Sequence, residues 1–126
     1  MIKYMVYIED SVVDKRVVES MVETVQDDYP KDKIEVKTIS LCCEKDFTTP
    51  IHEKVKNAVE SSDIIVFDYG GLCGVGLSGL VDYYNRFFME LVREHPNKDW
   101  RCISALDTFE QPDREELESL GVNFRW

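Results

Sequence analysis

Stretches of consecutive apolar residues alternate along the chain with segments in which apolar residues recur at helical spacing. Residues 63–68 place four large apolar residues between two aspartates, which is typical of a strand buried on both faces of a parallel sheet. Residues 2–8 and 100–105 predict similar strands. Residues 33–39 alternate strictly between polar and apolar and predict a strand at the sheet edge. A short apolar segment at 122–126 predicts a fifth strand.

Apolar residues three and four apart predict helices between these strands, over residues 12–25, 49–59, 80–92 and 111–120. The resulting order β-α-β-α-β-α-β-α-β predicts an α/β fold, because right-handed crossovers give a doubly wound, three-layer sandwich around a parallel five-stranded sheet. The flavodoxin-like strand order 2-1-3-4-5 is the most economical one, since the second strand has an edge pattern. We expect a single domain over residues 1–126, without the helix that usually follows the fifth strand.

The composition excludes several classes of protein. A net charge of −10, with acidic residues spread along the chain, argues against nucleic-acid binding and indicates a solvated acidic surface. No apolar run approaches the roughly 20 residues that cross a bilayer. The first residues lack the basic and long apolar parts of a leader, so we expect a cytoplasmic protein without membrane contact.

The cysteines and glycines do not form a recognised cofactor motif. Four cysteines without CxxC spacing predict reduced thiols rather than a zinc site, and Cys42-Cys43 stays open as a redox pair. The glycine-rich residues 70–79 could hold a phosphate through backbone N–H groups, but they lack Gly-Lys-Ser/Thr, so a flexible connection is favoured. The sequence predicts neither a nucleotide nor a flavin.

Acidic residues follow the first and third predicted strands. In the expected strand order, Glu9, Asp10 and Asp68 reach the same carboxyl edge of the sheet, and Ser104 follows the fourth strand there. Three neighbouring carboxylates repel one another unless a cation lies among them, which favours Mg²⁺. Asp68 would then accept a phosphoryl group as the nucleophile. A helix-capping Asp68 and a Ser104 that bonds only backbone are the structural alternatives.

These segments resemble the receiver domain of response regulators. Ile8-Glu9-Asp10-Ser11 is similar to its acidic pair, residues 63–68 to the strand that ends in its phosphoacceptor, Ile103-Ser104-Ala105 to its switch residue, and residues 113–122 to its fourth helix. By this resemblance, Glu9 and Asp10 would bind Mg²⁺ together with Asp68, Asp68 would accept the phosphoryl group, and Ser104 would report it.

The resemblance has gaps that shape the expected function. The family carries a lysine after the fifth strand, where this sequence has Phe124-Arg125-Trp126 and no further helix. We therefore expect a shortened, degenerate receiver-like regulatory module that binds a protein partner or itself and is not an enzyme. A working Mg²⁺-dependent phosphoacceptor switch is the alternative. The broad apolar arc of residues 80–92, which includes Tyr83 and Tyr84, also favours a partner protein or a homodimer.

Overall fold

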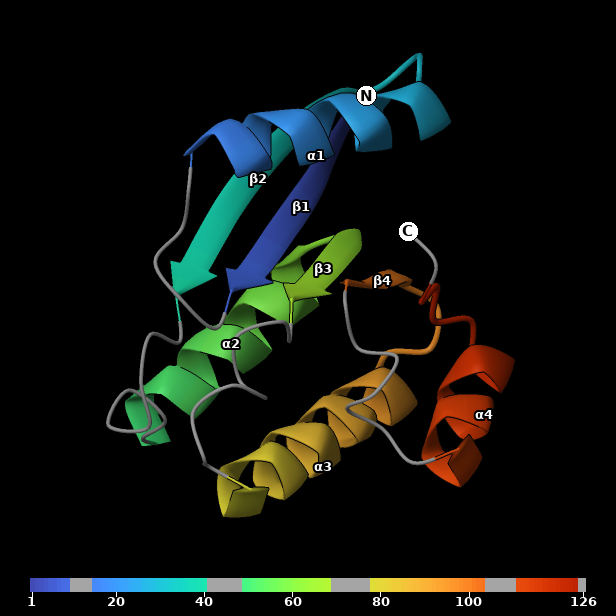
Figure 1. Ribbon diagram of the computed structural model, residues 1–126. Helices are drawn as coiled ribbons and strands as arrows, with labels where there is room; N and C mark the ends of the chain where they lie inside the picture. Colours follow the sequence, from blue (N-terminus) through green and yellow to red (C-terminus); the bar gives the residue numbers. More distant parts are fainter. Residues whose placement is uncertain (10–14, 41–48, 69–77, 104–110, 125–126) are drawn as a thin grey trace.

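The computed structural model describes residues 1–9, 15–40, 49–68, 78–103 and 111–124 (Figure 1). Strands and helices alternate along these residues, as the sequence predicts. The strands are β1 (Ile2–Glu9), β2 (Lys33–Ser40), β3 (Ile64–Asp68) and β4 (Asp99–Ile103). The helices are α1 (Lys15–Asp28), α2 (Thr49–Ser61), α3 (Ser78–Glu94) and α4 (Gln111–Ser119).

The four strands form one parallel sheet in the order β2-β1-β3-β4. β1 and β3 are the central strands and β2 lies at an edge, so these predictions are confirmed. The order is compatible with a flavodoxin-like layout, and the four described strands follow the first four positions of the predicted order 2-1-3-4-5.

The prediction of a fifth strand over residues 122–126 is wrong. Asn123 makes only an isolated parallel bridge to Arg101. Its amide donates to the carbonyl of Trp100 at 2.9 Å, and its carbonyl accepts from the amide of Cys102 at 2.8 Å. Val122 and Phe124 are buried as the apolar pattern requires. Backbone pairing does not extend beyond Asn123 within the described residues, which end at 124, so the described sheet has four strands.

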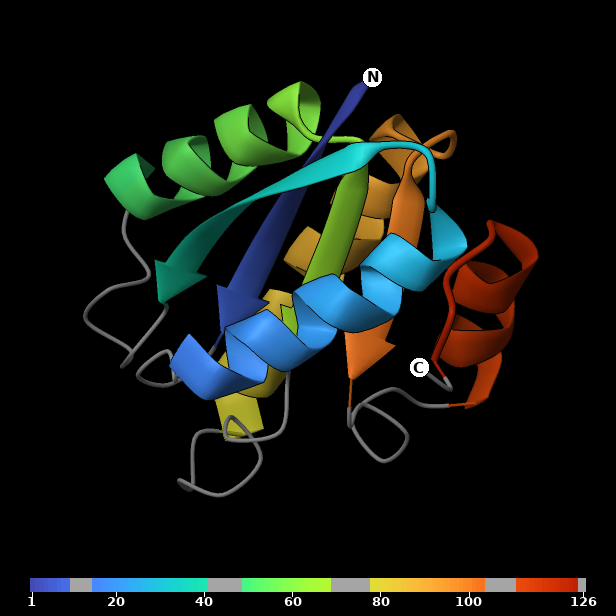
Figure 2. The same cartoon turned by 90° about the horizontal axis from the view of Figure 1, so that it is seen from above.

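The sheet separates two apolar cores, because α1 lies on one side of it and α2 and α3 lie on the other (Figure 2). On the α1 side, Met5, Tyr7, Ile64 and Val66 of the sheet pack with Val18, Met21 and Val25 of the helix. Alternate residues of the same strands face the other core, which also takes in Leu117 of α4. Burial on both faces explains why β1 and β3 are almost continuously apolar.

The broad apolar arc of α3 is used inside the molecule wherever its side chains are described. Phe87, Phe88 and Met89 are consecutive, yet each is at most 8% exposed. Phe88 makes edge-to-face contacts with Phe67, at 4.6 Å between ring centroids, and with Trp100, at 5.5 Å. The described side chains of α3 therefore leave no apolar face for a partner. The side chains of Tyr83 and Tyr84 lie outside the described part.

The end of α4 follows from a single glycine. Gly121 has φ of 98°, a left-handed conformation that glycine adopts without steric cost. Its amide donates to the carbonyl of Glu118, and the amide of Val122 donates to the carbonyl of Leu117, both at 3.0 Å. These two bonds form a Schellman cap, which ends α4 (Gln111–Ser119) close to the predicted bound of residue 120.

Candidate functional site

The carboxyl edge of the sheet brings together the ends of the first and third strands. Glu9 is the last residue of β1, and its neighbours in register are Asp68 of β3 on one side and Ser40 of β2 on the other. The structure therefore places the backbone of Glu9 beside that of Asp68, as the predicted strand order requires. The side chain of Asp68 lies outside the described part.

The side chain of Glu9 is held by its own strand. Tyr7 stands two residues earlier and faces the same side of the sheet, and its hydroxyl donates to Oε2 of Glu9. Glu9 is only 8% exposed and Tyr7 only 1%. Because a buried carboxylate needs hydrogen-bond donors to offset its desolvation, the phenol stabilises Glu9 at this position. Sequence reasoning missed Tyr7, because a tyrosine inside an apolar strand is indistinguishable from a core residue.

The other predicted site residues, Asp10 and Ser104, lie outside the described residues, as does Arg125. The glycine-rich residues 70–77 and the cysteines Cys42, Cys43 and Cys73 lie outside them as well. Cys102 is described and is a free, buried thiol. Among the described residues, no three His, Cys, Asp or Glu side chains come together as a metal site would need.

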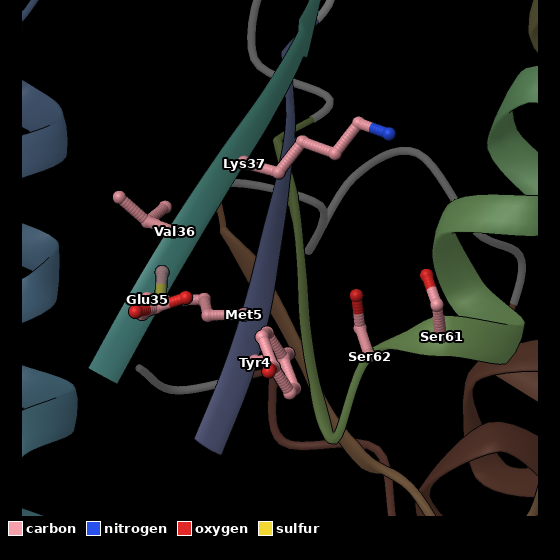
Figure 3. Close-up of a pocket in the computed structure, with 7 residues that line it drawn as sticks. All are labelled: Tyr4, Met5, Glu35, Val36, Lys37, Ser61 and Ser62. Carbon is pink, nitrogen blue, oxygen red and sulfur yellow. The ribbon is translucent and has the colours of Figure 1, made fainter. Parts of the chain in front are cut away.

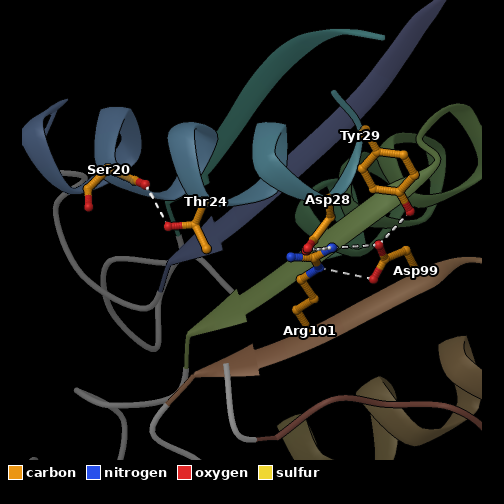
Figure 4. A network of polar contacts seen from close by, with 6 residues as sticks. All are labelled: Ser20, Thr24, Asp28, Tyr29, Asp99 and Arg101. Atoms are coloured by element: carbon orange, nitrogen blue, oxygen red, sulfur yellow. Dashed lines mark hydrogen bonds and ion pairs between the residues drawn. The ribbon is translucent and has the colours of Figure 1, made fainter. Parts of the chain in front are cut away.

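A polar network on the α1 side of β4 was not predicted from the sequence (Figure 4). The Arg101 guanidinium donates two hydrogen bonds, of 3.0 and 2.9 Å, to the Asp99 carboxylate. It also contacts Asp28 at the end of α1 at 2.8 Å, and the Tyr29 hydroxyl donates to Asp99 at 2.7 Å. The Arg101 side chain is only 6% exposed. The network thus ties the end of α1 to β4, and its sequence signal was a pair of opposite charges two residues apart.

These contacts shift the acidities of the groups involved. Burial, reinforced by the hydrogen bond to Asp99, raises the pKa of Tyr29 to about 12. Burial favours the neutral form of Asp99, but the hydrogen bonds from Arg101 and Tyr29 outweigh it and lower the pKa of Asp99. Burial likewise opposes the charge of Arg101, whereas Asp99 and Asp28 favour it, so the pKa of Arg101 is raised. Asp99 and Arg101 are therefore both charged at neutral pH, and Tyr29 is neutral.

A shallow hollow of about 390 Å³ opens near the amino ends of β1 and β2 (Figure 3). It is lined by Tyr4, Met5, Glu35, Val36, Lys37, Ser61 and Ser62. Tyr4 and Glu9 are five residues apart on one strand, so the hollow lies roughly 16 Å from the acidic edge at about 3.3 Å per residue. The two features are separate.

Among the helices that the structure describes, none has the length and apolar composition needed to cross a membrane. No protein-family model, no curated protein and no solved structure matches the chain.

Proposed function

We propose that this chain is a receiver-like regulatory module that acts by binding protein, with an acidic edge that does not carry out phosphotransfer. The observation that carries the receiver likeness is the register of Glu9 with Asp68 in a parallel sheet of order β2-β1-β3-β4. In such sheets ligands bind at the carboxyl edge. The flavodoxin-like comparison extends to these four strands.

The state of Glu9 favours a binding module over a phosphoacceptor. Glu9 is 8% exposed, and its carboxylate already accepts a hydrogen bond from Tyr7. Its burial is therefore offset by a protein donor, and a metal ion is not required for that purpose.

The alternative is a phosphoacceptor switch, which the pairing of Glu9 with Asp68 also supports. Glu9, Asp10 and Asp68 offer carboxylate oxygens, the ligand type that Mg²⁺ prefers, and the ion would supply charge neutralisation at this edge. An oxygen of Asp68 would attack the phosphorus of a phosphodonor, forming an acyl phosphate as the bond to the donor's leaving group breaks. Ser104 would then donate a hydrogen bond to a phosphoryl oxygen.

The two proposals differ in their response to a phosphoryl analogue. The measurement is the melting temperature of the wild type, Asp68→Asn and Asp27→Asn with and without Mg²⁺ plus beryllium fluoride. Intact mass after incubation with a small phosphodonor is recorded in parallel. Asp27 is an exposed residue of α1, so Asp27→Asn is a control for the same chemical change away from the acidic edge.

The binding module predicts no stabilisation by the analogue and no added mass in any of the three proteins. Stabilisation and added mass in the wild type and Asp27→Asn, but not in Asp68→Asn, would overturn it in favour of the switch. An equal stabilisation of all three proteins would mean that the analogue binds away from Asp68. Asp68 would then not be the phosphoacceptor of a switch.

A further inference from the structure

Among the residues that the structure describes, no strand pairs with the outer edge of β2. β2 is the edge strand of the sheet, and it pairs with β1 on its inner side. The amide of Lys33 donates to the carbonyl of Met1 at 2.9 Å, so the backbone groups of Lys33 point towards β1. Because these directions alternate along a strand, the N–H and C=O groups of Ile34, Val36 and Thr38 point outward.

Most side chains along this edge are also exposed to solvent. Lys33, Glu35, Lys37 and Thr38 are exposed, and Val36 is one of the exposed large apolar residues of the molecule at 38%. An unpaired edge strand can pair with another strand, but exposed charges, lysine above all, oppose that pairing unless the facing charges match. The charges of β2 therefore determine which partner strand fits.

We propose that β2 pairs antiparallel with β2 of a second copy of this chain, with the two-fold axis at Val36, so that two sheets join into one. This inference rests on the proposed function, since it names the surface and the partner of the binding module. The Val36 residues of the two copies would exchange both backbone hydrogen bonds, and Ile34 of each copy would do the same with Thr38 of the other.

The charges of β2 are self-complementary in this register. Glu35 of each copy lies opposite Lys37 of the other, so two oppositely charged pairs form across the axis. These positions are the closely spaced, non-hydrogen-bonded ones, where facing side chains approach most closely. A net charge of −10 per copy opposes association. At physiological salt, however, the screening length is about 8 Å, so only charges close to the contact repel one another strongly.

Other two-fold registers fit less well. Only residues with the same backbone direction can face each other, so the axis must pass through a residue. An axis at Glu35 places Glu35 against itself and Lys33 against Lys37. An axis at Lys37 places Lys37 against itself. An axis at Ile34 matches Lys33 with Glu35 but overlaps only residues 33–35 of the strand. The axis at Val36 alone combines matched charge with an overlap of residues 33–39.

The hollow beside β2 extends this contact surface. Figure 3 shows Val36 and Lys37 on opposite sides of β2, with Lys37 on the side of Tyr4 and Ser62. Tyr4 is the register partner of Glu35 and is 48% exposed. The Glu35–Lys37 pairs across the axis therefore lie next to an exposed aromatic ring, which adds apolar area to an edge held by backbone bonds.

The test is analytical ultracentrifugation of the full chain over a concentration series at physiological salt. The wild type is expected to dimerise. Glu35→Lys turns both matched pairs into Lys–Lys contacts and should weaken dimerisation by roughly tenfold or more. The double variant Glu35→Lys/Lys37→Glu restores opposite charges across the axis and should recover the wild-type dissociation constant. Glu19→Lys, the same change on an exposed position of α1, should leave it unchanged.

A backbone variant tests the same edge independently of charge. Val36→Pro removes an outward N–H without removing a bond to β1, so it should abolish the dimer while circular dichroism shows a folded chain. A wild type that stays monomeric, a dimer that survives Val36→Pro, or a double variant that fails to recover would each overturn the inference. These outcomes are distinct from failure of the proposed function, which is decided by the response of Asp68 to beryllium fluoride.

Discussion

Replacing Arg101 with leucine tests the polar network between α1 and β4. The Arg101 side chain is 6% exposed, and its guanidinium donates two hydrogen bonds to Asp99 and contacts Asp28. Leucine keeps part of the apolar volume of the side chain but leaves Asp99 with the hydroxyl of Tyr29 as its remaining donor in this network. We therefore expect Arg101→Leu to lower the free energy of unfolding.

The size of the expected loss in unfolding free energy follows from the exposure of the Asp99 and Asp28 side chains. Removing one partner of a fully buried ion pair costs about 3–5 kcal/mol. Because the Asp99 side chain is 25% exposed and keeps Tyr29, its share falls to about 2–3 kcal/mol. The Asp28 side chain is 56% exposed, so its pair adds about 0.2–1 kcal/mol. Arg101→Leu should therefore cost about 3 kcal/mol and lower the melting temperature by about 10 °C.

The assay is urea unfolding of the wild type, Arg101→Leu and Asp28→Asn between neutral and acid pH. The folded-state pKa of Asp99 is lowered, so its contribution to stability is present above the ordinary value of 3.8 and is lost as the pH falls through the lowered value. The difference between the wild type and Arg101→Leu should therefore shrink in acid. A difference that stays constant below pH 3.8, or an Asp28→Asn variant as unstable as Arg101→Leu, would refute this reasoning.

Two further predictions concern single residues. Gly121→Ala should lower the free energy of unfolding by about 1–2 kcal/mol in thermal melts, because alanine is strained at φ of 98° although an added Cβ meets no atom within 4 Å; an unchanged melting temperature would contradict the left-handed cap. The raised pKa of Tyr29 means that its contribution to stability is fully present below pH 10 and is lost as the pH rises towards about 12. Tyr29→Phe should remove that alkaline loss and delete one late step from the phenolate absorbance titration, and a titration without a missing late step would count against it.

The central architecture could be predicted because local pattern and burial agree. The apolar run of residues 64–67 leaves no polar face, so it fits a strand with helices on both sides. The alternation in β2 leaves a polar face, so it fits an edge. Once these two strands are placed, right-handed crossovers leave few possible orders, and the pairing of Glu9 with Asp68 follows.

The features that could not be predicted depend on distant partners. Residues 122–124 have the pattern of a strand, but the extent of a strand is set by the backbone it pairs with, and here that pairing is limited to Asn123. Tyr29 and Asp99 are 70 residues apart in sequence, so nothing in either segment indicates their hydrogen bond. Nothing in the sequence distinguishes Tyr7 from an apolar core residue, because its contact with Glu9 depends on a buried hydroxyl that composition does not reveal.

The position of β1 between β2 and β3 has a consequence for synthesis on the ribosome. β1 is translated before both of its partners, one of which is complete at residue 40 and the other only at residue 68. At about 5–20 residues per second, the nascent chain spends a few seconds with one edge of this largely apolar strand unpaired. The first half of this chain is therefore the segment that chaperones would need to shield during translation.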